Sequence, residues 1–264
     1  MNSGWSSAYR LSAPEFVTCW DRLGLGELPL ALELRRPGAT ADARAASYRQ
    51  EGASLTARGL ADARGRPHPG LAETLQLVAG PSFDCDLRCT GGLAPGLSIG
   101  LGSVRGRSGV VTLRHGERIA VRPTDGARVA ATLVELAGPL RASRGCPANI
   151  PATDFDVAFA GAPDHWAAAD RLVARGVARA EADSVARMLR GITSGGQLGA
   201  TAWVAGCHRR GDWVIGYHRA PGGACAQLRR PAGRHVVETV TITPTTAAQL
   251  LGLVEELIRA TASV

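Results

Sequence analysis

Ser98 is the residue whose neighbours come closest to a catalytic motif. It is the centre of Gly96-Leu97-Ser98-Ile99-Gly100, which matches the GxSxG pattern of a hydrolase nucleophile elbow. The elbow needs a strand, a sharp turn and then a helix, so that the serine is exposed above a parallel sheet. Here the pattern continues as an alternating strand, without a helix to supply the oxyanion hole, although the sequence leaves Asp and His partners open. We therefore predict that the protein is not an enzyme and has no catalytic residues.

The cysteines and histidines do not have the spacing of a metal site. The six cysteines form no CxxC pair, and the six histidines show no HxH or HExxH spacing. Cys85 and Cys89 would share one face of an expected strand and would need ligands from elsewhere to hold a metal. We predict small, buried, apolar thiols in a reducing compartment, and no metal. The chain also contains no lysine, which excludes a Walker A lysine, a Schiff-base lysine and a kinase lysine. We expect no cofactor.

The net charge of +7 comes entirely from arginine, which supplies all 30 basic residues. Their densest clusters are only pairs, at Arg35-Arg36, Arg209-Arg210 and Arg229-Arg230. A groove for nucleic acid normally combines a basic stripe with aromatic side chains for stacking, and aromatics are only 5% of this chain. We predict no nucleic-acid partner, and keep an arginine-rich, nucleic-acid-associated regulatory protein as the alternative from another class.

Two expected strands are rich in small side chains. One face of the expected strand Gly96–Val104 carries Ser98, Gly100 and Gly102, and the side chains around the strand that begins at Gln197 are again mostly small. Glycine weakens a strand and often marks close approach by another backbone, so these faces are candidate landing surfaces for a helical tip. Bulges or helix-on-sheet packing would explain the same pattern. The candidate partner-binding residues are Ser98, Gly100, Gln197, Leu198, Thr201 and Trp203. The next strand alternates Trp213, Ile215 and Tyr217, which we expect in the core.

The sequence repeats itself faintly. Residues 121–136 recur as residues 242–257, at an offset of 121. Both copies predict a strand that ends at proline, a threonine N-cap (Thr124 or Thr245) and a helix. Their apolar positions coincide at 129 and 250, 133 and 254, and 136 and 257. Two further echoes are Ala57–Ala61 with Ala174–Ala178, each at a helix end stopped by glycine, and Ala13–Trp20 with Ala152–Phe159.

The expected elements form two similar halves, about 10–137 and 152–262, joined by a linker at 138–151. In the first half we predict a short strand at Leu30–Arg35, helices near Pro14–Leu23, Thr40–Arg58 and Pro69–Ala79, and strands at Phe83–Cys89, Gly96–Arg105, Gly109–Arg114 and Arg118–Arg122. In the second half we predict helices near Pro163–Arg175, Glu181–Thr193 and Thr245–Ala260, with strands at Gln197–Ala205, Asp212–Arg219, Ala224–Arg230 and His235–Thr243. Strands grouped in runs indicate an α+β fold with a central antiparallel sheet. We predict one domain, 1–264, with internal pseudo-twofold symmetry.

The hydrophobicity of the chain is that of a globular protein, with 45% hydrophobic and 20% charged residues. The first 30 residues do not read as a signal peptide, because Met1–Arg10 is polar and Leu23–Leu34 is broken by Gly, Glu and Pro. No apolar run approaches the roughly 20 residues that span a bilayer. We expect a cytoplasmic protein without membrane insertion.

The stretch Leu11–Thr40 resembles the opening of the EspG family, the chaperones of actinobacterial type VII (ESX) secretion. The resembling positions are Glu15-Phe16 with Trp20, then Leu23-Gly24-Leu25-Gly26-Glu27-Leu28-Pro29, then Arg36-Pro37-Gly38 and Thr40. Gly196-Gln197-x-Gly199 also resembles the family. Ala220–Leu228 departs from it, because the acidic and tyrosine positions of the family's turn are missing.

The resemblance implies a central sheet with helical bundles on a quasi-twofold axis. It also implies a non-enzymatic cytosolic chaperone that binds a PE–PPE heterodimer at the tip of the PPE protein, keeps it soluble and directs it to the secretion system. Contact with the ESX machinery would follow at release. The departure at Ala220–Leu228 leaves open a diverged member that binds another helical-hairpin (WXG-type) substrate.

Overall fold

The structure is a computed structural model that describes residue 5 and residues 7–204, 207–230 and 237–262. The chain divides into two compact units. Unit 1 comprises Met1–Asp86 and Leu97–Leu133, and unit 2 comprises Leu87–Gly96 and Val134–Val264. Strand β2 (Phe83–Thr90) and helix α4 (Val129–Leu136) contribute residues to both. Each unit is described by itself.

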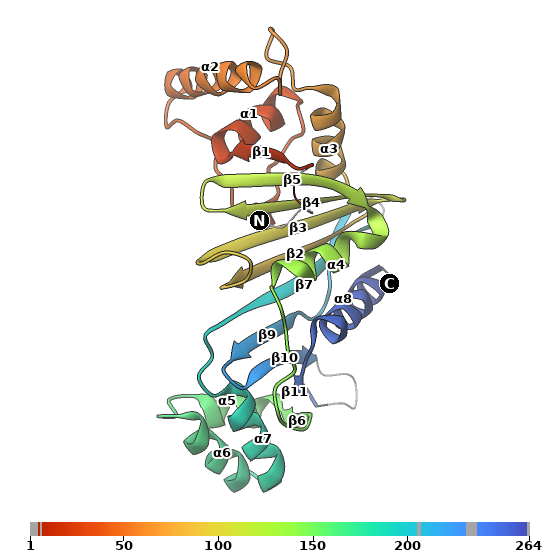
Figure 1. The fold of residues 1–264 in the computed structure, drawn as a ribbon. Coiled ribbons are helices and arrows are strands. Elements are labelled where there is room, and N and C mark those ends of the chain that lie inside the picture. The colour runs from red at the N-terminus through yellow and green to blue at the C-terminus, as the bar shows by residue number, and fades with distance from the viewer. Residues whose placement is uncertain (1–4, 6, 205–206, 231–236, 263–264) are drawn as a thin grey trace. The chain divides into compact units, whose positions relative to one another are not determined.

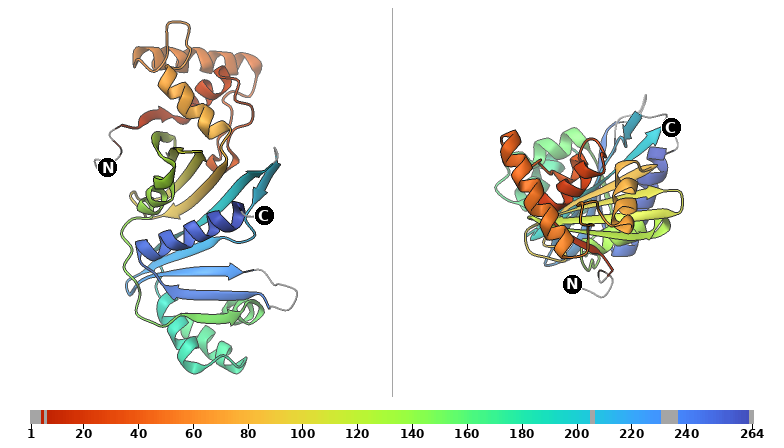
Figure 2. Two further views of the ribbon diagram at one scale, coloured as in Figure 1. Left: turned by 90° about the vertical axis from the view of Figure 1, so that its right-hand side faces the viewer. Right: turned by 90° about the horizontal axis from the view of Figure 1, so that it is seen from above.

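Unit 1 contains an antiparallel sheet in the order β1-β5-β4-β3 (Figure 1, Figure 2). Its strands are β1 (Tyr9–Ser12), β3 (Leu97–Arg105), β4 (Ser108–His115) and β5 (Arg118–Asp125). The predicted hairpin turn after His115 is present, with Gly116 in the left-handed region at a φ of 57°. Glycine adopts this conformation without steric strain, so a tight turn at Gly116 can join β4 to β5 and set their pairing.

Three helices, α1 (Ala13–Arg22), α2 (Ala41–Ala57) and α3 (Pro69–Ala79), cover one face of this sheet. Helix α1 begins where the sequence supplies a capping box: the Glu15 backbone N–H donates to Ser12 Oγ, and the Ser12 N–H donates to the Glu15 carboxylate. The unit 1 core joins the helices to β3, β4 and β5. Its largest fully buried side chains include Phe16, Trp20, Leu32, Leu55, Leu71 and Leu75.

The strand predicted at Leu30–Arg35 is wrong, because this segment forms a single 3₁₀ turn, η2 (Leu30–Leu32). Glu33 follows it with a φ of 50°, a left-handed conformation that is uncommon outside glycine. The backbone carbonyls of Leu32 and Glu33 both accept hydrogen bonds from Arg114 Nη1, each at 2.7 Å. A tertiary contact from β4 therefore replaces the expected ladder.

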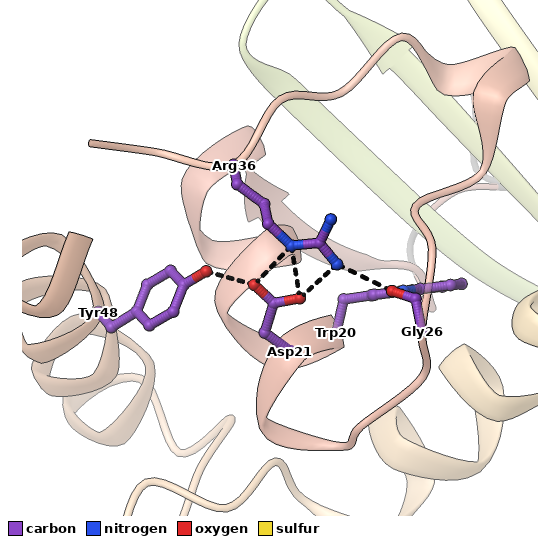
Figure 3. A network of polar contacts seen from close by, with 5 residues as sticks. All are labelled: Trp20, Asp21, Gly26, Arg36 and Tyr48. Atoms are coloured by element: carbon purple, nitrogen blue, oxygen red, sulfur yellow. Dashed lines mark hydrogen bonds and ion pairs between the residues drawn. The ribbon is translucent and has the colours of Figure 1, made fainter. Parts of the chain in front are cut away.

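The loop before and after η2 is tied to α1 and α2 by the polar network in Figure 3. Arg36 donates to the Asp21 carboxylate at 3.0 Å and to the Gly26 carbonyl at 2.8 Å. Trp20 Nε1 donates to the same carbonyl at 3.2 Å, and the Tyr48 hydroxyl donates to Asp21. The loop of residues 23–36 is thus a fixed layer over the unit 1 core.

Unit 2 contains an antiparallel sheet in the order β7-β9-β10-β11-β6, with β8 pairing with β7. The strands are β6 (Ala148–Pro151), β7 (Ser194–Val204), β8 (Cys207–Arg210), β9 (Ile215–Ala220), β10 (Gly223–Arg230) and β11 (Thr239–Pro244). Strands β6 and β8 were not predicted, and β6 occupies part of the expected linker. Residue 205 of one predicted strand and residues 235 and 236 of another lie outside the described residues.

The helices of unit 2 are α5 (Ala152–Phe159), α6 (His165–Ala174), α7 (Arg179–Leu189) and α8 (Ala247–Ala262). Helix α5 was seen in the sequence only as an echo of α1. Helix α6 begins two residues later than predicted because Asp164 caps it, accepting from the N–H groups of Trp166 and Ala167 at 2.8 Å. Helix α7 ends before Gly191, not at Thr193. Helix α8 lies along the sheet, and α5–α7 lie at its β6 end (Figure 2).

The elements from β1 to α4 and those from β6 to α8 follow the same order, except that β8 and two 3₁₀ turns have no counterpart. The paired apolar positions of the repeat are all buried: Val129, Leu133, Leu136, Leu250, Val254 and Leu257. The predicted caps are wrong by one residue. Asp125 caps a 3₁₀ turn, η3 (Gly126–Arg128), before α4, and Thr246 exchanges hydrogen bonds with Gln249 at the start of α8. The α+β class with antiparallel pairing is confirmed, whereas the single domain and the pseudo-twofold symmetry stay predictions.

Candidate functional site

Ser98 does not lie in a nucleophile elbow. It is the second residue of β3, which continues as a strand to Arg105 and pairs with β4. Its side chain is only 6% exposed, and Ser98 Oγ lies 3.1 Å from Nδ1 of His115, its cross-strand neighbour. The strand–turn–helix geometry of the elbow is therefore replaced by a hairpin, and the pair forms a partly buried polar contact between two strands.

The small residues of β3 are explained in part by helix packing. A Cβ on Gly102 would overlap Val129 Cγ1 and Leu133 Cδ1 of α4, and a Cβ on Gly109 of β4 would overlap Val129 Cγ2. Glycine at these positions lets α4 lie close to the strand backbones. Gly100 and Ser98 share this face of β3 by alternation, and both are buried. On β3, the packing of α4 therefore explains why residue 102 is glycine.

One face of the unit 2 sheet is covered by α8. Leu198, Ala200 and Ala202 of β7 are buried, and Leu198 is fully inaccessible. Leu198 is opposite Ile215 in the register, and Ile215 is also fully buried. The side chain of Leu198 is therefore part of the core beneath α8, where it positions β7.

The opposite face of β7 carries the other predicted residues of this strand. Gln197 is exposed, and Thr201 and Trp203 are half-buried. Residues 197, 199, 201 and 203 alternate with the buried ones, so they point away from α8. We call this surface, with its continuation on β8, β9 and β10, the open face.

The hairpin of β7 and β8 shapes one part of the open face. His208 lies opposite Trp203 in the register, and their ring centroids are 3.7 Å apart. Arg210 Nη1 donates to Thr201 Oγ1 at 3.3 Å, and its guanidinium occupies the space that a side chain at Gly199 would need. His208 and Arg210 were missed because β8 was not predicted. The two-residue connection between Val204 and Cys207, which ends in glycine, is the hairpin signal that would have revealed it.

Strands β9 and β10 extend the open face up to Cys225, which lies on the same face of β10 but is buried and donates to the Met188 carbonyl of α7. His218 Nε2 and Gln227 Oε1 are 2.9 Å apart, and both side chains are half-buried. Gly216 lies opposite Gln227 in the register and adds no side chain to this part of the face. Of the three predicted core residues, Ile215 and Tyr217 are fully buried on the α8 side, as expected. Trp213 precedes β9 and is half-buried, with the Arg230 guanidinium 5.5 Å from its ring centroid.

The thiols of this chain are mostly core groups. Cys19, Cys85, Cys89 and Cys225 are buried, whereas Cys146 and Cys207 are exposed, contrary to the prediction for all six. Burial raises the pKa of Cys225 to about 12, so it is a neutral thiol at physiological pH. Among the described residues, no cluster of three or more His, Cys, Asp or Glu side chains could hold a metal ion. In the same part of the chain, no helix is long and apolar enough to cross a membrane.

Similarity to known proteins covers almost all of the chain. The model of the EspG family matches residues 12–256. A solved structure of the Mycobacterium tuberculosis type VII secretion system chaperone EspG5, in complex with the PE25-PPE41 dimer, has the same fold with a TM-score of 0.74 at 14% sequence identity. That match covers 96% of each chain. No curated protein sequence matches. Because the family model spans far more than half of its length, this chain belongs to the EspG family.

Proposed function

We propose that this protein is a non-enzymatic cytoplasmic chaperone of type VII (ESX) secretion that binds a PE–PPE heterodimer through the PPE protein. It keeps the dimer soluble and directs it to the secretion system, where the machinery displaces it. Membership of the EspG family supports this proposal, and the similar fold of EspG5, which was solved with a PE–PPE dimer, supports it further.

The observation that carries the proposal is the open face of unit 2. Binding without nucleotide needs a preformed surface that combines an apolar anchor with polar groups around it. The open face provides Trp203 as the anchor and Gln197 and Thr201 as polar neighbours, all on one strand. Helix α8 packs against the opposite face of this strand, so the surface is already formed before the partner binds.

The six residues predicted from sequence fall into three groups in this proposal. Gln197, Thr201 and Trp203 contact the partner directly. Leu198, as a core residue, fixes the strand that presents them. Ser98 and Gly100 are buried on β3 of unit 1 and do not offer an exposed side chain.

Exposed apolar side chains elsewhere in unit 2 could extend the contact, and sequence reasoning did not identify them. Trp166 of α6 is 41% exposed and Val157 of α5 is 54% exposed, although both helices are otherwise packed on the core. Ile192, two residues before β7, is 42% exposed. Large side chains of this kind are the usual anchors of protein interfaces.

The test is co-expression with the PE–PPE pair encoded nearest to the gene, followed by size-exclusion chromatography with light scattering. We expect a stable 1:1:1 complex. The variant Trp203→Arg should abolish it, whereas Leu30→Arg, which alters an exposed leucine of unit 1, should not. Separate elution of the wild-type chaperone and the pair would refute the partner. A pull-down with WXG-type hairpin proteins would then test the alternative substrate.

A further inference from the structure

Trp203, the anchor that we propose on the open face, stacks on its cross-strand neighbour. His208 of β8 lies directly opposite it in the register, and the two ring centroids are 3.7 Å apart with the planes tilted by 44°. His208 is exposed and Trp203 is half-buried, so the imidazole covers part of the indole and leaves the rest accessible. The contact therefore holds the indole against the sheet in a position that a partner can still reach.

Trp203 lies in the part of β7 that forms the hairpin with β8. Pairing with β9 covers Ser194–Leu198, and pairing with β8 covers Thr201–Val204. A tryptophan on a strand surface has several staggered rotamers in the absence of a neighbour, and fixing one of them on binding costs free energy. A stack that already selects one rotamer in the free protein removes most of this cost. The ring at position 208 therefore prepares the anchor before the partner binds.

His208 is also the group of this contact that changes its charge near neutral pH, since histidine ordinarily titrates at about pH 6.5. On the same face of β8, the next side chain is Arg210, which donates to Thr201 Oγ1 at 3.3 Å and keeps its positive charge. Cys207 and Arg209, the neighbours of His208 in sequence, point to the other face by alternation. Strand β7, which pairs with β8, contains no ionisable side chain.

Carboxylates that would compensate a charged imidazole are absent from strands β7, β8, β9 and β10, whose sequences contain no aspartate or glutamate. The next acidic residue along the chain is Asp212, exposed in the connection to β9. The other histidine of the open face, His218, lies opposite Gly195 in the β7–β9 pairing and contacts Gln227 instead. An imidazolium at position 208 would thus meet a permanent cation on its own face and no carboxylate on these four strands.

We infer that His208 is the positioning residue of Trp203 and that the partner binds while this imidazole is neutral. The inference rests on the proposed function and specifies how the same site is regulated. A partner that covers Trp203 also takes its stacked neighbour out of water, and a charged imidazole then loses its hydration beside Arg210. The attraction between an imidazolium and an indole is present before and after binding, so it does not offset this loss. Binding therefore releases a proton from His208 and weakens as the pH falls.

The first experiment measures the affinity of the PE–PPE pair by isothermal titration at about pH 7.5 and about pH 5.5. For a histidine of ordinary pKa, about 6.5, that must be neutral in the complex, the affinity falls about tenfold between these two values. His208→Ala should weaken binding about fivefold already at the higher pH, because the stack is lost. His208→Phe keeps a stacked ring without a titrating proton. It should therefore restore the affinity at the higher pH to within about twofold and remove the roughly tenfold fall.

The matched control is His68→Asn, which removes an exposed histidine of unit 1. His68 caps α3 by accepting the Gly70 N–H at 3.3 Å, and asparagine is also a good N-cap. This variant should keep the wild-type affinity at both pH values. An unchanged affinity in His208→Ala, or an equal pH effect in wild type and His208→Phe, would overturn the inference.

The second experiment needs no partner. A charged imidazole quenches the fluorescence of an indole that it contacts, so the stack can be followed in the free chaperone. The emission of Trp203, one of five tryptophans, is the difference between each protein and its Trp203→Phe derivative. We expect this emission to fall in wild type when the pH is lowered from about 7.5 to about 5.5, and to stay constant in His208→Phe. A fall of the same size in His208→Phe would show that His208 does not hold Trp203.

Failure of this inference and failure of the proposed function are distinguishable. If the pair binds wild type and both His208 variants equally tightly at both pH values, the proposed function stands and the positioning role is wrong. If the pair does not bind wild type while the Trp203 emission depends on His208, the PE–PPE partner is wrong and the positioning of Trp203 stands.

Discussion

The first helices of the two units make the same contacts from equivalent positions. In unit 1, Phe16 and Trp20 stack with ring centroids 5.6 Å apart, and in unit 2, Phe155 and Phe159 stack at 4.5 Å. A carboxylate one residue before the first ring then pairs with an arginine at the end of a later helix. These ion pairs are Glu15 with Arg58 at 2.8 Å and Asp154 with Arg175 at 2.7 Å.

The two arginines also end their helices in the same way. Arg58 and Arg175 are each the C-cap residue and are followed by a glycine in the left-handed region, with φ of 68° at Gly59 and 94° at Gly176. In each case the next residue donates its backbone N–H back to the helix, Leu60 to Leu55 at 2.8 Å and Val177 to Leu172 at 3.1 Å. This is the Schellman pattern of hydrogen bonds, built twice.

The two ion pairs differ in their surroundings. The Glu15 side chain is 4% exposed and also accepts from Ser54 at 2.8 Å and from the Ser12 backbone, whereas the Asp154 side chain is 20% exposed. Burial alone would raise the pKa of Glu15, but these hydrogen bonds and Arg58 outweigh it and lower the pKa. The same pair therefore stabilises the protein more in unit 1 than in unit 2.

The units also differ in what covers the sheet. Residues 23–40 join α1 to α2 in unit 1 and place η2 against β3, with Leu32 fully buried. The equivalent connection in unit 2, between α5 and α6, is only residues 160–164. It is too short to supply such a layer, so part of the sheet surface stays exposed there. Unit 1 therefore covers its sheet with a loop, whereas unit 2 leaves exposed the surface that we propose as the partner site.

The largest effect is expected from a substitution in the loop that covers the unit 1 sheet. Truncation of the buried Leu32 to alanine should lower the unfolding free energy of unit 1 by about 3 kcal/mol, because the deleted side chain leaves a cavity between η2 and β3. Hydrogen exchange of the α1–α3 peptides reports the loss. Leu30→Ala, two residues away and 89% exposed, is the control and should cost less than about 0.5 kcal/mol. If Leu32→Ala raised hydrogen exchange equally in α5–α7, the loss would not be confined to unit 1, and this would contradict the idea that each unit has its own cover over its sheet.

The second test blocks the open face of unit 2 with a bulky side chain. Gly216→Trp places a bulky side chain on β9 where a Cβ meets only ordinary contacts, 3.4 Å or more away. We expect binding of the PE–PPE pair to weaken about 100-fold, or ~2.7 kcal/mol, through steric exclusion. Gly222→Trp, in the β9–β10 turn with no neighbour within 4 Å, should leave affinity unchanged. Isothermal titration measures both affinities, and tight binding by Gly216→Trp would show that the partner binds outside the open face.

Neutralising the equivalent carboxylates sharpens the comparison. Glu15→Gln keeps the shape of the side chain but removes the charge from a buried hydrogen-bonded site, so it should cost about 2 kcal/mol. Asp154→Asn, the matched change in unit 2, should cost only about 0.5 kcal/mol. Urea unfolding followed by exchange of each helical segment measures the two values. Equal losses would mean that burial does not distinguish the pairs.

The smallest expected effect is the pH dependence of the Glu15 contact. Because its folded-state pKa is lowered, its contribution is complete above the unfolded value of about 4.3 and is lost as pH falls through the folded value. The α1 and α2 segments should therefore lose exchange protection when the pH is lowered below about 4. The Glu15→Gln variant should lack this part of the acid response. An unchanged acid response in that variant would assign it to other carboxylates.

The sequence predicted well the features that depend on neighbours along the chain. The pairs of apolar positions in the repeat, such as Val129 and Leu250, are buried because helical periodicity alone defines one face. Gly59 and Gly176 end helices because glycine tolerates a positive φ. Short elements were predicted poorly. Strand β6 and helix α5 are four and eight residues long, so they carry little periodic signal of their own.

By itself, then, the sequence determined the family, the α+β class and two alternating faces on β7, since each follows from order, spacing and period. Only the tertiary structure decided which face is open. Alternation separates Leu198 from Gln197 but does not say that α8 covers the first and leaves the second exposed. Coverage depends on where distant segments return, and on connection lengths such as residues 23–40 against 160–164. These are long-range properties that no local pattern in the chain encodes.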